Sequence, residues 1–404
     1  MINNYGEILE LKLQNNKITK QLTTNTASYE FRTCSQCGSS KIIEKYMLNL
    51  QNKKILYILS GNQPSSLVRA LVFEEEFKKE KIHVTFYHLH STLLWRSLNF
   101  TTFYPVLLFF RILNRLYFEF KKYVLLKKVN KYNVIIAIKY LDSNFLKLIK
   151  TKSKAILIYD FDDAVWLDQQ WGEIEFSKII STADYVTSDN TYLANYASIY
   201  NKNSFVVNGP CQIEKFISYK NSIIKSANQN KTIVLGWIGS PATLFYLYKI
   251  YDALEQIGEK YPNVILKLVG AGAERLLLPP FEKIRIVTVP EYNQIEMIKN
   301  VYSFDIGLYP LFLNELSLGR GSLKATIYMS GGVPVVCSEI GENTNIIEDG
   351  INGFLANDTD EWVEKLSRLI ESQELRATVG ENGFNYAKAN YSIEFCKNQL
   401  LNII

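Results

Sequence analysis

Two cations stand among small residues where a short helix is expected to begin. The segment "GRGSLKATIYMSGG" places Gly319, Arg320, Gly321, Ser322 and Lys324 before and inside the first turn of a helical pattern. The first turn of a helix presents free backbone N–H groups and the positive end of the helix dipole, and both favour an anion. The segment therefore predicts a binding site for a diphosphate.

The end of the same helix indicates what it must connect to. Gly331 and Gly332 allow a left-handed C-terminal cap, and Pro334 prevents the helix from continuing. The apolar run "VPVVCS" that follows is typical of a buried strand. A plain helix-to-strand turn without a ligand explains these glycines equally well, but it does not explain the cations at the helix start.

Carboxylates form a second candidate group. Asp160, Asp162 and Asp163 follow the buried run "KAILIY", and functional groups gather at the carboxyl ends of parallel strands. Helix caps and turn residues are the alternative role for these aspartates. The end of the first predicted strand, "KKILYILSG", is expected to bring three further residues to the same edge: Gly61, Asn62 and Arg69.

The elements that must position these residues follow one repeated order. Apolar runs without alternation predict strands that are buried on both faces of a parallel sheet. Helical patterns separate these runs, which predicts a doubly wound α/β architecture. The runs are "KKILYILSG", "IHVTFYHL", "YNVIIAIKYL" and "KAILIYDF", and then, from residue 231, "KTIVLGWIG", "VILKLVGAG", "IRIVTV", "FDIGLYPL" and "GVPVVCSE".

The two series predict two Rossmann-like domains in one chain. The 404 residues are 47% apolar, enough for two cores. The expected parts are a polar extension (1–50), an N-terminal domain (51–212), a C-terminal domain (213–390) and a last helix (391–404) that crosses back to the first domain. Two such sheets that face each other form a cleft able to clamp an extended ligand.

Composition narrows the class of protein. A net charge of +5, with both signs mixed along the chain, argues against a nucleic-acid partner. Five cysteines without a disulfide pattern, and no signal peptide at the start, favour a cytoplasmic location. Cys34 and Cys37 have the spacing of half a zinc ribbon, but no second pair or nearby histidine completes it. We expect no metal there.

Taken together, these motifs resemble a known family. The run "DIGLYPLFLNELSLGRGSLKATIYMSGGVPVVCSEIGENTNIIEDGINGFLA" resembles the donor-site region of the GT-B-fold, family-4-type glycosyltransferases. "YDFDDAVW", "GWIGSPATLFYL" and "LRATVGENGFNYAKANYS" are similar to the same family at corresponding places, so the resemblance covers about residues 53–395. It implies transfer of a sugar from a nucleoside-diphosphate sugar to an acceptor, with retained anomeric configuration and neither a cofactor nor an obligatory metal.

The resemblance also implies roles for single residues. Arg320, Ser322 and Lys324 would bind the donor diphosphate, approached by the backbone at Gly239 and Ser240. The resemblance puts Glu315 opposite the donor sugar, which makes it a candidate catalytic residue. We place Asp162 and Asp163 on the sugar or acceptor side of the cleft as candidate catalytic residues. Ile327 and Asn345 stand where the family has acidic residues. The alternative is therefore a degenerate member that binds a nucleotide sugar without turnover.

Two other enzyme classes fit less well. "ILIYDFDD" resembles the first motif of haloacid-dehalogenase-type phosphatases, with Asp160 as nucleophile and Asp162 as acid. That motif normally opens its domain, whereas here it lies mid-chain and Ala164 replaces the usual Thr or Val. A Rossmann dehydrogenase would need a G-x-G-x-x-G loop after a strand, and none is present. Many family-4 relatives carry a histidine after a middle strand, but none follows "NVIIAIKYL".

Residues 103–132 combine aromatic side chains with positive charge. Arg111 interrupts the apolar stretch after eight residues, which is too short to span a bilayer. Seven of the eight charged residues are positive, which favours a helix lying on an anionic membrane surface. A helix packed on the sheet with solvated cations is the alternative. The first interpretation predicts a peripheral protein at the inner membrane face, with a glycan or lipid-linked acceptor.

Overall fold

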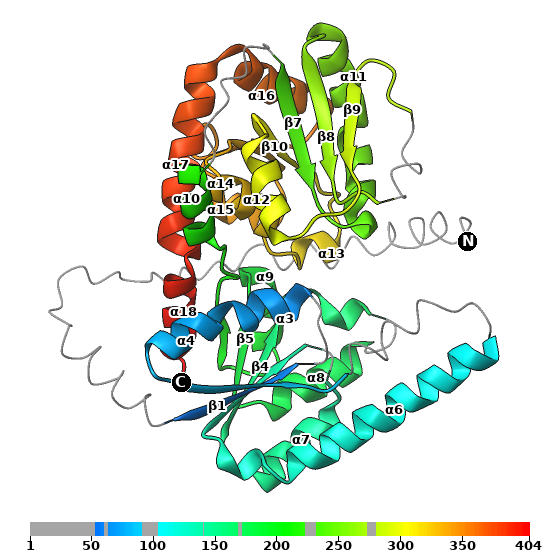
Figure 1. The fold of residues 1–404 in the computed structure, drawn as a ribbon, viewed down its shortest axis with the longest axis vertical. Coiled ribbons are helices and arrows are strands. Elements are labelled where there is room, and N and C mark those ends of the chain that lie inside the picture. Colours follow the sequence, from blue (N-terminus) through cyan, green and yellow to red (C-terminus); the bar gives the residue numbers. More distant parts are fainter. Residues whose placement is uncertain are drawn as a thin grey trace, which may run out of the picture. The chain divides into compact units, whose positions relative to one another are not determined.

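The computed structural model describes residues 53–59, 64–90, 104–139, 141–168, 172–222, 232–272 and 280–404. The predicted extension at 1–50, with Cys34 and Cys37, lies outside the described residues, and so do Gly61 and Asn62. The described chain contains two parallel six-stranded sheets, so the predicted α/β fold with two doubly wound sheets is confirmed (Figure 1).

The first sheet has the strand order β2-β1-β3-β4-β5-β6, and every neighbouring pair is parallel. Its strands are β1 (Lys54–Leu59), β2 (His83–His88), β3 (Val134–Ile138), β4 (Ile156–Phe161), β5 (Tyr185–Ser188) and β6 (Ser204–Val206). The helical elements of this part are α3 (Pro64–Arg69), η3 (Leu71–Phe73), α4 (Glu74–Lys79), α6 (Tyr104–Leu126), η4 (Val129–Lys131), α7 (Ser143–Lys152), η5 (Val165–Leu167), α8 (Gly172–Thr182) and α9 (Thr191–Ser198).

The second sheet repeats this plan with the order β12-β11-β10-β7-β8-β9. Its strands are β7 (Ile233–Ile238), β8 (Val264–Val269), β9 (Arg285–Val289), β10 (Ile306–Tyr309), β11 (Val335–Ser338) and β12 (Phe354–Ala356). The helical elements are α10 (Ile213–Ser222), η6 (Pro241–Ile250), α11 (Tyr251–Lys260), α12 (Gln294–Tyr302), α13 (Glu315–Leu318), α14 (Leu323–Ser330), α15 (Asn343–Ile346), α16 (Thr359–Glu371), α17 (Gln373–Tyr391) and α18 (Ile393–Leu401).

Each sheet has one point where the strand order reverses. In the first sheet the chain moves outward from β1 to β2 and then resumes at β3 on the other side of β1. In the second sheet the same reversal lies between β7 and β10. Ligands of open α/β sheets bind beyond the carboxyl ends of the strands at such a point. The two reversals therefore indicate where functional side chains are expected.

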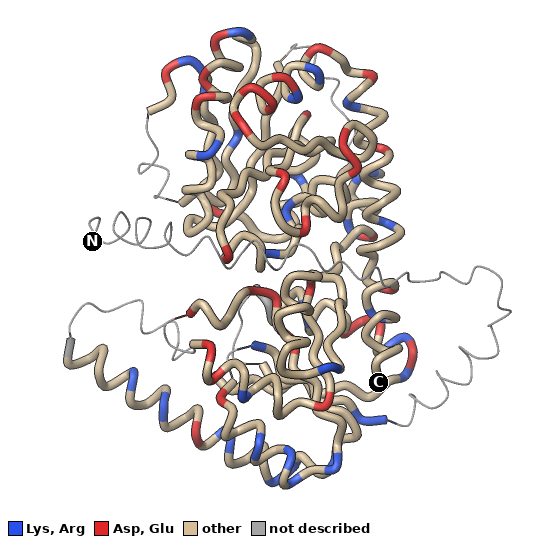
Figure 2. Tube along the Cα trace, turned by 180° about the vertical axis from the view of Figure 1, so that it is seen from behind, with Lys and Arg blue, Asp and Glu red and all other residues tan. Residues whose placement is uncertain are grey.

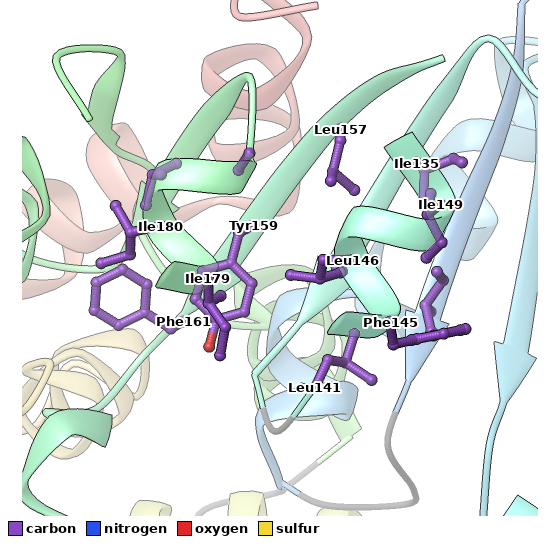
Figure 3. Close-up of a cluster of buried hydrophobic side chains, with 14 of the residues drawn as sticks. Ile135, Leu141, Phe145, Leu146, Ile149, Leu157, Tyr159, Phe161, Ile179 and Ile180 are labelled. Atoms are coloured by element: carbon purple, nitrogen blue, oxygen red, sulfur yellow. The ribbon is translucent and has the colours of Figure 1, made fainter. Parts of the chain in front are cut away.

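Buried strands fill the interior of both sheets. All five residues of β3 are buried, which explains its unbroken apolar sequence. Figure 3 shows side chains of β3 and β4 packed against α7 and α8, among them Ile135, Leu157, Phe145 and Ile180. Charged residues of both signs are interspersed along the described chain, in agreement with its small net charge (Figure 2).

Helix α14 ends as its sequence predicts. Gly332 has a φ of 67°, in the left-handed region that favours glycine. Its N–H donates to Met329 O at 2.8 Å, and the N–H of Val333 donates to Tyr328 O at 3.0 Å. This pair of hydrogen bonds is the Schellman motif, which satisfies the last carbonyls of the helix. The chain can then enter β11 directly.

Two of the connections between strands are not single continuous helices. The segment from 65 to 81 contains α3, η3 and α4. The break lets Arg69 contact Asp160 while Phe73 and Phe77 enter the core. After β7, the ten-residue 3-10 helix η6, which has Pro241 at its first turn, precedes α11.

The last helix, α18, contacts elements of the first sheet. Lys397 pairs with Glu80 next to α4, and both side chains are largely buried. Gln399 Oε1 accepts from the N–H of Asn208 at 2.9 Å. The chain end also takes part, because Lys53 Nζ donates to Ile404 O at 3.3 Å. These contacts tie the two ends of the described chain together.

Candidate functional site

Residues beyond the carboxyl ends of the two sheets contact each other. Trp166 Nε1, in η5, donates to Glu315 Oε1 at 3.0 Å, and the hydroxyl of Tyr192 donates to the same oxygen at 3.4 Å. Gly319 lies against the loop after β4, where an added Cβ would come within 2.7 Å of Ala164 Cβ. The segment before α14 is therefore held against the segment after β4, and the candidate site lies here.

Arg320 and Lys324 supply the positive charge of the site. Lys324 Nζ donates to Thr243 Oγ1 at 3.1 Å and lies 4.5 Å from the ring centroid of Trp237. Burial, and then the charge of Arg320, lower the pKa of Lys324 to about 7. The Arg320 guanidinium lies 5.4 Å from the ring centroid of Tyr246, and its Nε is buried without a hydrogen-bond partner.

These two cations are not neutralised by close carboxylates. Among the described residues, neither Arg320 nor Lys324 forms an ion pair with an aspartate or glutamate. For Lys324, burial and the neighbouring charge of Arg320 both disfavour the charged ammonium. An anionic ligand would relieve both effects. The arrangement is therefore suited to a diphosphate.

The loop after β7 reaches the same place. A Cβ on Gly239 would lie 2.7 Å from Lys324 Nζ and 2.8 Å from Thr243 Oγ1, so only glycine fits without displacing them. Ser240 follows as the exposed N-cap residue of η6. The structure thus brings together the two loops that the sequence placed around a diphosphate. Ser322 differs, because its hydroxyl is buried and donates to Asn343 Oδ1 at 3.0 Å.

A lysine that the sequence analysis passed over organises the acidic side. Lys139 directly follows β3, has a φ of 44° and is only 4% exposed. Its Nζ donates to Asp162 Oδ1 at 3.0 Å and also to Asp163 Oδ2. Non-glycine residues with positive φ concentrate at functional sites. The sequence did place Lys139 at the carboxyl end of a buried strand, which could have indicated a functional residue, but the family resemblance directed attention to a histidine there.

Asp163 lies between the acidic side and the cations. Burial and the neighbouring charge of Asp162 raise its pKa, whereas Lys139 and Arg320 act in the opposite direction. The carboxylate of Asp163 is more exposed than that of Asp162, at 39% against 20%. Of the three aspartates after β4, Asp163 is therefore the one best placed to meet a ligand.

Asp160 and Arg69 have a structural role. Arg69 Nε and Nη2 donate to the two Asp160 oxygens at 2.9 and 2.6 Å, and Thr187 Oγ1 donates to Oδ2 at 2.6 Å. Arg69 Nη1 also donates to Val207 O. Both charged residues are 4% exposed. Arg69, expected at the cleft edge, is thus an interior residue, and Asp160 has no accessible oxygen with which to attack a phosphate.

Asp189 is a second residue that the sequence analysis missed. It follows β5, and its Oδ2 would lie 2.0 Å from a Cβ added to Gly321. Burial raises the pKa of Asp189 well above its usual range. The close approach explains why the residue after Arg320 must be glycine. No set of three or more metal-ligating side chains gathers in the part of the chain that the structure describes.

Comparisons with known proteins agree with this geometry. Residues 231–372 match the family model described as Glycosyl transferases group 1. Spore coat protein SA of Bacillus subtilis (strain 168) is 23% identical over 283 residues, which cover 64% of this chain and 74% of that protein. The capsular polysaccharide biosynthesis glycosyltransferase CapM of Staphylococcus aureus is 21% identical over 195 residues, 47% of this chain and half the length of CapM.

Solved structures show the same fold at low sequence identity. Anabaena Alr3699/HepE, in complex with UDP and glucose, has a TM-score of 0.58 at 15% identity and covers 87% of this chain and 98% of its own. Sucrose-phosphate synthase from Thermosynechococcus elongatus has a TM-score of 0.61 at 14% identity, with the same coverage. The part of this chain that matches the family model includes Gly239, Glu315, Arg320 and Lys324 and ends before α17.

Proposed function

We propose that this protein transfers a sugar from a nucleoside-diphosphate sugar to an acceptor, because residues 231–372 match the family model described as Glycosyl transferases group 1 and the fold is shared with GT-B glycosyltransferases. One observation carries the proposal most directly. Arg320 and Lys324 are both partly buried, Lys324 Nζ lies against Gly239, and neither cation forms an ion pair with a carboxylate among the described residues. The related fold of HepE holds UDP and glucose, which is the ligand chemistry that such a site would need.

The chemistry follows from where charge develops. Sugar transfer breaks the bond between the anomeric carbon and the diphosphate oxygen, so negative charge grows on the leaving group. Fixed cations aimed at that charge stabilise the transition state more than the bound donor. Diphosphate binding would also raise the pKa of Lys324 from about 7, because the anion favours the charged ammonium.

The opposite side of the site carries the carboxylates. In this proposal Asp163 and Glu315 face the sugar, and Lys139, which donates to both Asp162 and Asp163, holds Asp163 in position. The resemblance to family-4 enzymes supports transfer with retained anomeric configuration and without a cofactor. The names of CapM and the spore coat protein support a glycan or lipid-linked acceptor in surface polysaccharide or glycoconjugate synthesis. A peripheral position at the inner membrane face completes the proposal.

A degenerate member that binds the donor without turnover is the second candidate. Two family carboxylates are replaced, and both substitutes have structural contacts. Ile327 packs against the core of the second sheet, and Asn345 Nδ2 donates to Glu342 Oε2 at 3.1 Å. If the protein binds a nucleotide sugar but neither transfers the sugar to any acceptor nor hydrolyses the donor, the result would favour this candidate over the enzyme.

Nucleotide binding tests the cation pair. Thermal shift with a panel of nucleotide sugars should identify the donor, and hydrolysis and transfer assays should follow on each positive result. Arg320→Ala and Lys324→Ala should each weaken donor binding by about 1.5 to 3 kcal/mol, the range for charge-assisted hydrogen bonds. Lys388→Ala, at an exposed position of α17, is the matched control. Unchanged affinity in both site variants, with the fold intact, would refute the assignment.

Turnover tests the acidic side separately. Asp163→Asn keeps the size of the side chain but removes the charge that faces Lys139 and Arg320. We expect turnover to fall by about 100-fold, the order seen when one positioned group is lost, while donor affinity changes little. Should Asp162→Asn and Asp163→Asn both keep wild-type turnover, the cluster has only a structural role.

A further inference from the structure

Helix α6 carries a row of large apolar side chains that no described element covers. Phe109, Ile112, Leu116, Phe120 and Tyr123 are between 51% and 63% exposed. Their spacings of three, four, four and three residues place them on one face of the helix. We call these five residues the outer stripe. Single exposed apolar residues are ordinary, but a continuous row is typical of an interaction surface.

The opposite face of α6 already accounts for the packing of the helix. Asn114 and Leu125 are buried, and Phe118 packs against the core of the first sheet. The hydroxyl of Tyr87 in β2 donates to Lys121 O at 3.0 Å, which fixes the helix from the same side. Figure 1 shows the N-terminal half of α6 extending past α7, away from the strands. The outer stripe is therefore not needed to hold α6 on its sheet.

Positive charge flanks the outer stripe. Between Tyr104 and Lys131 the chain has seven cations and one carboxylate, Glu119. Two of the cations point inward: Lys121 Nζ lies 4.1 Å from the ring centroid of Tyr87, and Lys122 pairs with Asp142 and Glu119. The other five are exposed, two on α6 and three in the segment that directly follows it: Arg111, Arg115, Lys127, Lys128 and Lys131.

We propose that the outer stripe of α6 docks on an anionic lipid bilayer, with the helix lying in the plane of the surface. The stripe extends for about 21 Å along the helix, from fourteen residue steps of about 1.5 Å. Apolar side chains would enter the boundary between headgroups and acyl chains, while the exposed cations contact anionic headgroups. None of the described helices is both long and apolar enough to cross a membrane, so the contact is with one surface.

Charge favours a membrane over a second copy of this chain. A two-fold interface places the same surface against itself, so the five exposed cations of one copy would face those of the other and repel them. The one carboxylate of each copy, Glu119, already pairs with Lys122. Anionic lipid, in contrast, complements the whole helix. Docking would bring the site close to a membrane-borne acceptor, and this consequence rests on the proposed function. Lipid binding itself can be measured without any turnover.

Co-sedimentation of the full chain with vesicles tests the proposal. Vesicles of phosphatidylcholine mixed with phosphatidylglycerol should bind the protein at low salt, and binding should fall as salt rises. The triple variant Phe109→Ser, Leu116→Ser, Phe120→Ser should lose binding by about tenfold or more, because it removes the inserted apolar area. Arg111→Gln with Arg115→Gln should weaken binding to anionic vesicles and reduce its salt dependence.

Matched controls separate the stripe from general surface apolarity. Ile174 and Ile199 are 74% and 66% exposed on other elements, so Ile174→Ser with Ile199→Ser should leave vesicle binding unchanged. The triple variant should also keep wild-type nucleotide-sugar affinity, which shows an intact donor site. If vesicle binding responds to salt and to the variants as described but no sugar transfer is found, the docking proposal is supported and the proposed function is rejected.

Two results would overturn the docking proposal. One is equal recovery in the supernatant with anionic and neutral vesicles at low salt. The other is that the natural protein does not bind vesicles but self-associates in sedimentation equilibrium, and that the triple variant no longer self-associates. The second result would identify another copy of this chain as the occupant of the outer stripe. Sugar transfer in either case would leave the proposed function standing.

Discussion

Replacing Lys324 with methionine should stabilise the ligand-free protein at neutral pH while it weakens diphosphate binding. Lys324 faces Trp237 and Thr243, and burial together with Arg320 lowers its pKa from 10.5 to about 7. Keeping Lys324 protonated therefore costs free energy in the folded protein but not in the unfolded chain. Methionine has a similar length and no charge, and Thr243 Oγ1 keeps its bond to Ser240 O at 2.9 Å.

The size of the effect follows from the pKa difference. A fall from 10.5 to about 7 corresponds to about 4.8 kcal/mol, at about 1.36 kcal/mol for each pH unit. Lys324 is only partly inaccessible to water, which reduces the cost, so we expect about 2 to 4 kcal/mol. Below pH 7 both states are charged and the full cost applies. Between pH 7 and 10.5 only the unfolded chain keeps the proton, so the stability of the natural protein rises with pH.

Urea unfolding at two pH values measures this difference. At about pH 6.5 the methionine variant should be more stable by the full amount, and at about pH 9.5 by less than about 1.4 kcal/mol. Lys388→Met, at an exposed position, should change stability at neither pH. A methionine variant that is less stable than the natural protein at both pH values, or a gain that does not depend on pH, would refute the reasoning.

Three further predictions follow from the same contacts. Arg69→Met should destabilise the protein by about 3 to 5 kcal/mol in urea unfolding, because it leaves Asp160 buried without its partner, while nucleotide affinity stays unchanged. Gly239→Ala should reduce donor affinity in calorimetry and also lower stability, because the added Cβ would displace Lys324 Nζ and the buried ring of Trp237. The affinity for a nucleotide sugar, whose diphosphate has no group titrating near neutral pH, should be constant below pH 7 and fall by up to about tenfold per pH unit above it, as Lys324 loses its proton. Constant affinity from pH 6 to 9 would contradict this last prediction.

The strands and the donor loops could be predicted because their signals are local. A strand buried on both faces needs an unbroken apolar run, and β3 and β11 show it over their whole length. The end of α14 was predictable because the φ of 67° at position 332 lies in the left-handed region that strongly favours glycine. The approach of Gly239 to Lys324 was implied by the family resemblance, and it agrees with the rule that ligands bind at the carboxyl ends of parallel strands.

The rest depends on contacts between distant parts of the chain. Arg69 and Asp160 are 91 positions apart, and nothing in either local sequence shows that they form one buried pair. Lys139 and Asp189 were missed because a strand pattern fixes where a residue lies but not which way its side chain points. The basic character of α6 was plain in the sequence, yet only the fold shows that Lys121 and Lys122 turn inward while the outer stripe faces away.

The separation of charge across the site supports sugar transfer over simple anion binding. Arg320 and Lys324 lie before and inside α14, whereas Asp162 and Asp163 follow β4 on the other sheet. A site that only bound a diphosphate would need the cations alone. Transfer of a sugar develops positive charge on the ring as well as negative charge on the leaving group, since its transition state resembles an oxocarbenium ion. Carboxylates on one side and cations on the other match both charges, and Asp163, which interacts with Lys139 and Arg320, lies where the two halves meet.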